Sequence, residues 1–232
     1  MRPWTCSGML TLAGIFVLVL AAEAASRTNE EEISRLLSRL RREPKSATVL
    51  RELGGRYAIR ASEEGYPTDI EDSRKYLDAA EKIEPKSPKL FAWKGILRLV
   101  EAKIRGVKGY VNEGLRLLDR AVGMEPDSLV LRMLRGSADL EVPREFGRLA
   151  EGIADLEMIE AAHRKDPAAL PRLELDPAEV HLKLGNGYRG KGDLERSISY
   201  WRQVVSESPS SKESDSARRL LRKHGAPDSK KP

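Results

Sequence analysis

The tetrapeptide EPKS stands at residues 43–46 and again, unchanged, at 84–87. Its proline belongs to a longer series in which prolines follow one another after 41, 41, 41 and 42 residues, at Pro44, Pro85, Pro126, Pro167 and Pro209. Glycines follow the first three of these prolines by ten residues, at Gly54, Gly95 and Gly136, and the fourth module has Gly185. Because self-similarity at a fixed period of this length is typical of repeat architectures, the chain is expected to be an array of similar modules.

Each module is predicted to end in a helix that stops at its proline. Segments with helical spacing of apolar residues precede the prolines, and proline disfavours helical geometry in the residue before it. These segments are SRKYLDAAEKI, GLRLLDRAVGM and IADLEMIEAAH. In the fourth module Leu194, Ile198, Trp201 and Val205 follow the same helical period, and Asp193 is the expected N-cap. The helix before it is expected to start at Asp176 and Pro177.

The amino terminus differs from the rest of the chain. Residues 1–25 contain Arg2, an apolar run from 9 to 21 and small residues before the end, which predicts a secretory signal peptide. An uncleaved membrane anchor is the alternative, although the apolar run is short for one. The only cysteine, Cys6, lies in this segment, so the mature chain must be stabilised by packing without disulfides.

Composition agrees with exposed helices in a chain that is not embedded in a membrane. Of the 232 residues, 33% are charged, 40% are hydrophobic and 5% are aromatic, and the net charge is +5. Basic tracts at 39–42 and 218–223 are interpreted as helix C-termini, where positive charge is favourable, so nucleic acid is not an expected partner.

The modules resemble the tetratricopeptide repeat (TPR) family. The fourth module fits best, with Leu184, Gly185, Tyr188, Ser197, Trp201 and Pro209 at pattern positions 7, 8, 11, 20, 24 and 32 and Val204 as a loose match at 27. The first module supplies Leu53, Gly54, Tyr57, Ser73, Leu77, Ala80 and Pro85, and the second supplies Phe91, Gly95, Gly114, Leu118, Ala121 and Pro126. The third is weakest, with Gly136, Ile159, Ala162 and Pro167 but Asp155 where a small residue is expected.

This resemblance implies an all-α solenoid of stacked antiparallel helix pairs that form a right-handed superhelix. The expected organisation is a capping helix at 26–46, four helix-pair repeats at 47–211, a second capping helix at 212–224 and a disordered tail at 225–232. The modules exceed the 34-residue family period by seven residues. In the first three modules these residues either lengthen the first helix or form a loop between the helices, and in the fourth they lie before Asp176, in ALPRLEL. In the third module the segment VPREFGR, at 142–148, could fold onto the concave face.

No catalytic, metal or cofactor site is predicted. GNGYRG at 185–190 matches the GxGxxG pattern but lies in an expected helix without the preceding strand that a dinucleotide site needs. His163, His181 and His224 lack ligand spacing and are expected at the surface or at helix ends. No GxSxG signature occurs, so the chain is not expected to be an enzyme.

A concave face is the expected functional surface, because solenoids of helix pairs use such faces to bind peptides or partner helices. In the TPR family this face is lined by positions 2, 5, 9 and 12 of the first helix of each repeat. The resemblance carries this role to a predicted partner-binding groove of Arg51, Lys89, Ala92, Ile96, Leu99, Met133, Ser137, Leu140, Leu182, Asn186 and Arg189. For the apolar members, packing beneath the extra loops is an equally good interpretation.

Together these features predict an exported scaffold that mediates protein–protein interaction in the bacterial cell envelope. It would act as an accessory subunit of an envelope assembly or transport system, in the periplasm or secreted. The alternative is a receptor for a small ligand or polymer fragment held under the long inter-helix loops.

Overall fold

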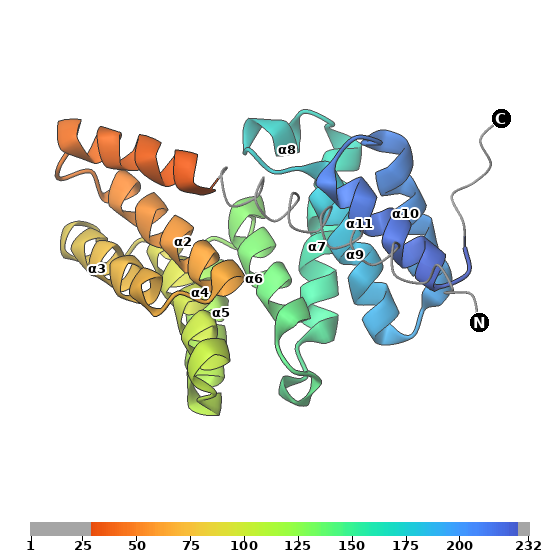
Figure 1. Ribbon diagram of the computed structural model, residues 1–232, viewed down its shortest axis with the longest axis horizontal. Coiled ribbons are helices and arrows are strands. Elements are labelled where there is room, and N and C mark those ends of the chain that lie inside the picture. Colours follow the sequence, from red (N-terminus) through yellow and green to blue (C-terminus); the bar gives the residue numbers. More distant parts are fainter. Residues whose placement is uncertain (1–28, 227–232) are drawn as a thin grey trace, which may run out of the picture.

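The computed structural model describes residues 29–226, which form an all-α array of consecutive helix pairs. The pairs follow one another in chain order along the longest axis of the molecule (Figure 1). They are α2 (Ala47–Glu64) with α3 (Pro67–Ile83), α4 (Pro88–Arg105) with α5 (Lys108–Met124), α6 (Leu129–Glu141) with α7 (Leu149–Lys165), and α9 (Pro177–Lys191) with α10 (Leu194–Glu207). The predicted all-α solenoid of helix pairs is therefore confirmed.

Further helices flank and interrupt the four pairs. The described chain is helical from 29 to 42, ahead of α2, and α11 (Lys212–Lys223) packs against α10 after the last pair. The short α8 (Ala169–Arg172) lies between α7 and α9. The predicted signal peptide and most of the predicted tail lie outside the described residues. Among the helices of residues 29–226, none is long and apolar enough to cross a membrane.

The repeated EPKS tetrapeptide forms the turn between successive helices. In the first copy the amide of Ser46 donates to the carbonyl of Glu43 at 3.0 Å, and in the second Ser87 donates to Glu84 at 3.3 Å. The turn at 125–128 is closed by the same bond, at 3.1 Å. The Ser46 hydroxyl also accepts a hydrogen bond from the first turn of α2, as an N-cap does. Repetition of the sequence thus reflects repetition of one helix-ending and helix-starting turn.

In the first three modules the seven surplus residues are accommodated in two ways, so both alternatives left open by the sequence occur. In the fourth module they precede α9 and include α8 (Ala169–Arg172). In the first two modules the helices are longer, and only two residues join them. Each joint begins with a glycine in the left-handed region, Gly65 at φ 76° and Gly106 at φ 69°, a conformation that glycine adopts without steric cost. In the third module α6 ends early, and a loop at 142–148 containing η1 (Arg144–Phe146) leads to α7.

Glycines let the two helices of a module approach closely. A β-carbon on Gly95 would lie 2.8 Å from the carbonyl oxygen of Gly114, and one on Gly114 would lie 2.8 Å from that of Gly95. Gly136 faces Gly152 in the same reciprocal way, at 3.1 and 3.0 Å. The small residue of the third module is therefore Gly152, three residues before Asp155, which stands where the family pattern expects a small residue.

Gly152 takes this position because the seven surplus residues are distributed differently in the third module. Gly152 follows Gly136 by 16 residues, whereas Gly114 follows Gly95 by 19, so three of the extra residues of the third module lie after the helix contact, towards the end of α7. A uniform period therefore conceals a shift in register inside one module.

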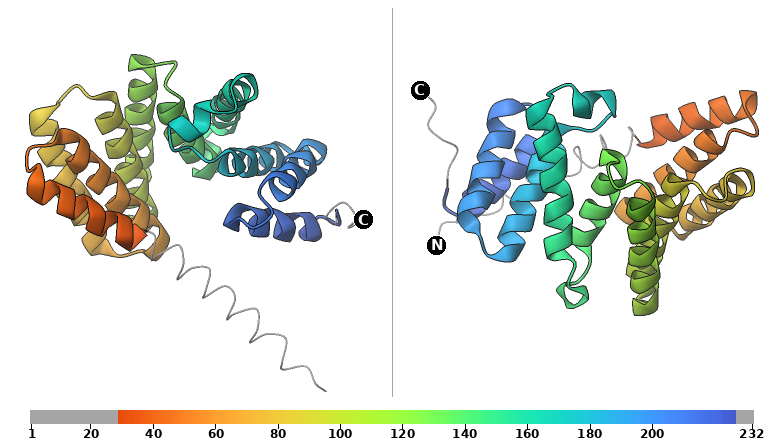
Figure 2. Two further views of the ribbon diagram at one scale, coloured as in Figure 1. Left: turned by 90° about the horizontal axis from the view of Figure 1, so that it is seen from above. Right: turned by 180° about the vertical axis from the view of Figure 1, so that it is seen from behind.

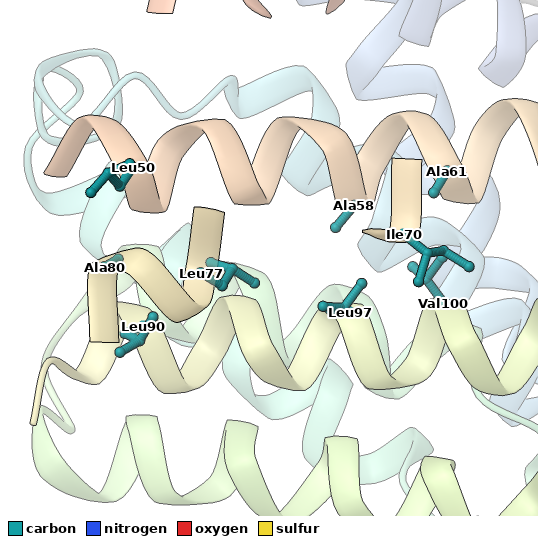
Figure 3. Close-up of a cluster of buried hydrophobic side chains, with 9 residues drawn as sticks. All are labelled: Leu50, Ala58, Ala61, Ile70, Leu77, Ala80, Leu90, Leu97 and Val100. Carbon is teal, nitrogen blue, oxygen red and sulfur yellow. The ribbon is translucent and has the colours of Figure 1, made fainter. Parts of the chain in front are cut away.

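The hydrophobic core includes clusters that join the helices of consecutive modules, as stacked repeats require. Figure 3 shows the part between α2, α3 and α4, which is formed by Leu50, Ala58, Ala61, Ile70, Leu77, Ala80, Leu90, Leu97 and Val100. Ile96 packs against this cluster and also against the next one, which joins α4 and α5 to α6. The views in Figure 2 show the same succession of pairs from above and from behind.

Candidate functional site

Three residues of the predicted groove are buried in the array. Arg51 donates hydrogen bonds from Nη1 to Glu84 Oε2 at 2.9 Å and to Ser87 Oγ at 3.2 Å, so it links α2 to the second EPKS turn. Ala92 and Met133 are 0% and 7% exposed and pack inside the core. These side chains present almost no surface to a ligand.

Other apolar groove residues are partly buried against neighbouring helices. Ile96 and Leu99 each pack against two core clusters that include residues of α4, and Leu182 packs against the cluster around Trp201. Lys89, by contrast, is exposed. Packing thus accounts for most of the apolar side chains in the middle of the predicted groove.

The remaining four groove residues meet at one cavity. Ser137 and Leu140 of α6 line it together with Asn186 and Arg189 of α9, and the cavity has a volume of about 330 Å³. The loop at 142–148 and the start of α7 complete its wall, through Val142, Pro143, Arg144, Arg148 and Leu149. We call this hollow the α6–α9 cavity.

The 142–148 loop is anchored on the preceding module and forms one wall of the cavity. Val142 and Phe146 pack against Leu115 and its neighbours at the α4–α5 joint. Lys108 Nζ lies 2.7 Å from Glu145 Oε1, which adds an exposed ion pair between the same segments. The loop therefore lies across the junction between the second and third modules.

A buried carboxylate and a guanidinium form the polar floor of the cavity. Arg148 Nε donates to Asp139 Oδ1 at 2.9 Å, and Arg148 Nη2 donates to Asp119 Oδ1 at 2.6 Å. Burial raises the pKa of Asp139 to about 6, despite the Arg148 guanidinium beside it. Arg135 connects Asp119 to Asp155, so the ion pairs continue away from the cavity as a network.

Several cavity residues were not predicted from the sequence. Asp139 and Arg148 had no motif to mark them, because their partners lie in other helices. Lys183 could have been found, since residues 183, 186, 187 and 190 follow the i, i+3, i+4, i+7 spacing of one face of α9. Arg144 lies in the 142–148 loop, which the sequence analysis expected at the concave face.

One histidine differs from the expectation. His181 is 2% exposed rather than at the surface, because it lies on the side of α9 that packs against α10. Its Nδ1 lies 3.2 Å from Glu207 Oε2, and its ring centroid is 6.1 Å from that of Tyr200 and 6.4 Å from that of His163. No group of three or more histidine, cysteine or acidic residues in the described part of the chain could hold a metal ion.

We expect His181 to make stability depend on pH. Burial lowers its pKa below the ordinary value of 6.5, although Glu207 and Glu160 oppose the shift. The unfolded chain therefore binds a proton at His181 more readily than the folded chain does. The free energy of unfolding consequently decreases as the pH falls below about 6.5. Urea denaturation of wild type and His181→Gln from neutral to mildly acidic pH should show a steeper loss in wild type, and parallel curves would contradict the prediction.

Comparison with known proteins adds two structures of low similarity. No protein-family model and no curated protein matches the sequence. YrrB, a TPR protein with an unusual peptide-binding site, aligns over 85% of this chain and 87% of its own, with 16% identity and a TM-score of 0.48. The MamA protein aligns over 94% and 97%, with 14% identity and a TM-score of 0.42. The description of this chain as a TPR-like repeat protein rests on its own helix pairs and recurrent turns.

Proposed function

We propose that this chain is a non-enzymatic scaffold that binds another protein, and that the α6–α9 cavity anchors a segment of that partner. The observation that carries the proposal is the convergence of Ser137, Leu140, Asn186 and Arg189 from two neighbouring first helices on one hollow. Arrays of helix pairs commonly present extended peptide-binding surfaces. A hollow on such a surface gives a side chain of the partner a defined place to insert.

The proposed location is the bacterial cell envelope, in the periplasm or outside the cell. The support comes from residues 1–25, whose basic start, apolar run and small residues have the pattern of a secretory signal. There the chain would serve as an accessory subunit of an assembly or transport system. Detection of the mature amino terminus by mass spectrometry of the fractionated native protein would test export and cleavage together.

A receptor for a small ligand or polymer fragment is the second candidate, favoured by the size of the same cavity. Its volume of about 330 Å³ lies within the range of roughly 300 to 1,000 Å³ that is usual for small-molecule sites. Native mass spectrometry of the purified protein would reveal a bound molecule as added mass. A mass present in wild type and absent when the cavity is filled by mutation would favour this candidate.

Filling the cavity should weaken partner binding. Ser137 is half-buried and lines the cavity, so Ser137→Arg would occupy the space that the partner segment needs. We expect a partner enriched from an envelope extract by wild type to be recovered at roughly one tenth of the amount or less, which corresponds to ~1.4 kcal/mol of binding free energy. Quantitative mass spectrometry of affinity eluates measures this ratio.

The matched control for this experiment is the same substitution on an exposed serine. Ser199 lies on α10 and does not line the cavity, so Ser199→Arg should leave recovery unchanged. Equal recovery with both variants, or no specific partner with wild type, would contradict the proposed function.

A further inference from the structure

Basic side chains outnumber acidic ones in the lining of the α6–α9 cavity. Four basic side chains line it, Arg144, Arg148, Lys183 and Arg189, against two acidic ones, Asp139 and Glu141. The two acidic groups are already engaged. Asp139 pairs with Arg148, and Glu141 lies 3.9 Å from Lys183.

Two of these lining arginines, Arg144 and Arg189, lack a counter-ion from the described part of the chain, and the guanidinium of Arg189 lies over the Trp201 ring, 6.0 Å from its centroid. Neither Arg144 nor Arg189 has a carboxylate oxygen within 4.0 Å among residues 29–226. Arg144 reaches towards α9, because its Nη2 lies 4.0 Å from the place that a β-carbon on Gly190 would occupy. Two like charges beside one hollow repel each other, and an anion placed between them would relieve this repulsion. Guanidinium groups pair best with planar carboxylates, through two parallel hydrogen bonds.

The cavity also offers a hydrogen-bond acceptor to a ligand. Asn186 Oδ1 is buried and has no hydrogen-bond partner within the described residues. A buried polar atom left without a partner costs roughly 1 to 3 kcal/mol, so a ligand that supplied an N–H group would gain from satisfying it. A ligand that carries both carboxylates and N–H groups fits these needs better than a simple anion, and a peptide backbone with acidic side chains has both.

We propose that the α6–α9 cavity binds acidic side chains from a segment of the partner protein. Arg144 and Arg189 would pair with the side-chain carboxylates, and Asn186 would accept a hydrogen bond from a backbone amide of the segment. Leu140, Pro143 and Leu149 supply an apolar wall for the aliphatic part of an aspartate or glutamate. This inference rests on the proposed function and adds the chemistry of the bound segment.

Selection from a random peptide library tests the inference, because the library samples acidic and non-acidic segments alike. Peptides displayed through their C-termini carry no free terminal carboxylate, so any acidic preference must come from side chains. We expect peptides selected by the wild-type protein to be enriched in aspartate and glutamate. One selected peptide, synthesised with a fluorophore, should bind at least about tenfold more weakly to Arg144→Glu/Arg189→Glu, because each lost charge-assisted hydrogen bond contributes about 1.5 kcal/mol or more.

The control variant carries the same two substitutions elsewhere. Arg42 and Arg202 are exposed and lie outside the cavity, so Arg42→Glu/Arg202→Glu changes the net charge equally and should bind the peptide within about twofold of wild type. Because Arg144 and Arg189 are also exposed, the cavity variant should fold, and its thermal denaturation by circular dichroism verifies this.

The possible outcomes separate this inference from the proposed function. Peptides without acidic enrichment that still require an unfilled cavity, as judged with Ser137→Arg, would overturn the inference and leave the scaffold function standing. Equal weakening by the control variant, or displacement of the peptide by free glutamate as readily as by unlabelled peptide, would also overturn it. Failure to select any peptide would count against the scaffold function itself.

Discussion

Asp155→Ala is expected to lower the free energy of unfolding by about 3 to 5 kcal/mol, the usual cost of removing one partner of a buried ion pair. The Asp155 side chain is 1% exposed and accepts hydrogen bonds from two arginines of α6. Arg135 approaches it with Nε at 2.7 Å and Nη2 at 2.9 Å, and Arg132 Nη1 lies at 2.5 Å. Removal of the carboxylate would leave both guanidinium groups beside α7 with their main counter-ion lost. Urea denaturation followed by circular dichroism measures the change.

The exposed pair between Lys108 and Glu145 provides the comparison. These side chains are 81% and 55% exposed, so Glu145→Ala should change stability by less than about 1 kcal/mol. A similar loss in both variants would show that burial of Asp155 does not decide its contribution. A separate early transition in Asp155→Ala would instead locate the damage in the third module, since stacked repeats can unfold in parts.

Gly95→Ala should destabilise the protein by roughly 2 kcal/mol, although alanine is the better helix former by about 1 kcal/mol. The added methyl group would lie 2.8 Å from the Gly114 carbonyl oxygen and 2.9 Å from Leu118 Cγ. A backbone oxygen in a packed helix cannot turn aside as a side chain can, so α4 and α5 would have to separate. Thermal and urea denaturation should both show the loss.

The same substitution at Gly123 is the control and should have the opposite sign. Gly123 lies near the end of α5, and no atom of residues 29–226 outside its own neighbourhood is within 4 Å of its β-position. Only helix propensity then changes, and Gly123→Ala should raise the free energy of unfolding by up to about 1 kcal/mol. A stabilising effect at both sites would mean that the contact between Gly95 and Gly114 has room for a methyl group.

The sequence predicted the helix pairs because their causes are local. Helical periodicity, proline at the turns and the caps Asp176 and Asp193 all act within a few residues, and the structure confirms both caps. These local signals did not predict the register of the third module. Its surplus is divided between the 142–148 loop and the end of α7, and only the contact between Gly136 and Gly152 reveals the division.

The cavity was only partly predictable for a related reason. Ser137, Leu140, Asn186 and Arg189 follow from the family pattern, because that pattern states which side of each first helix faces inward. The ion pairs around the cavity depend on contacts between different helices, such as Arg148 with Asp119, 29 residues apart. These pairs occupy the nearby carboxylates, and Arg144 is left without a counter-ion among the described residues. The same pattern placed Met133 on the concave face, whereas the packing of α6 against α7 buries it.

The attachment of the 142–148 loop also has a mechanical consequence. Val142 and Phe146 hold the loop to the second module, while the opposite wall of the cavity belongs to α9 of the fourth module. Any bending of the array between these modules changes the separation of Arg144 and Arg189. A ligand that bridges them would fix the local curvature and stiffen the array, and by reciprocity a partner that imposes another curvature would change the affinity for that ligand.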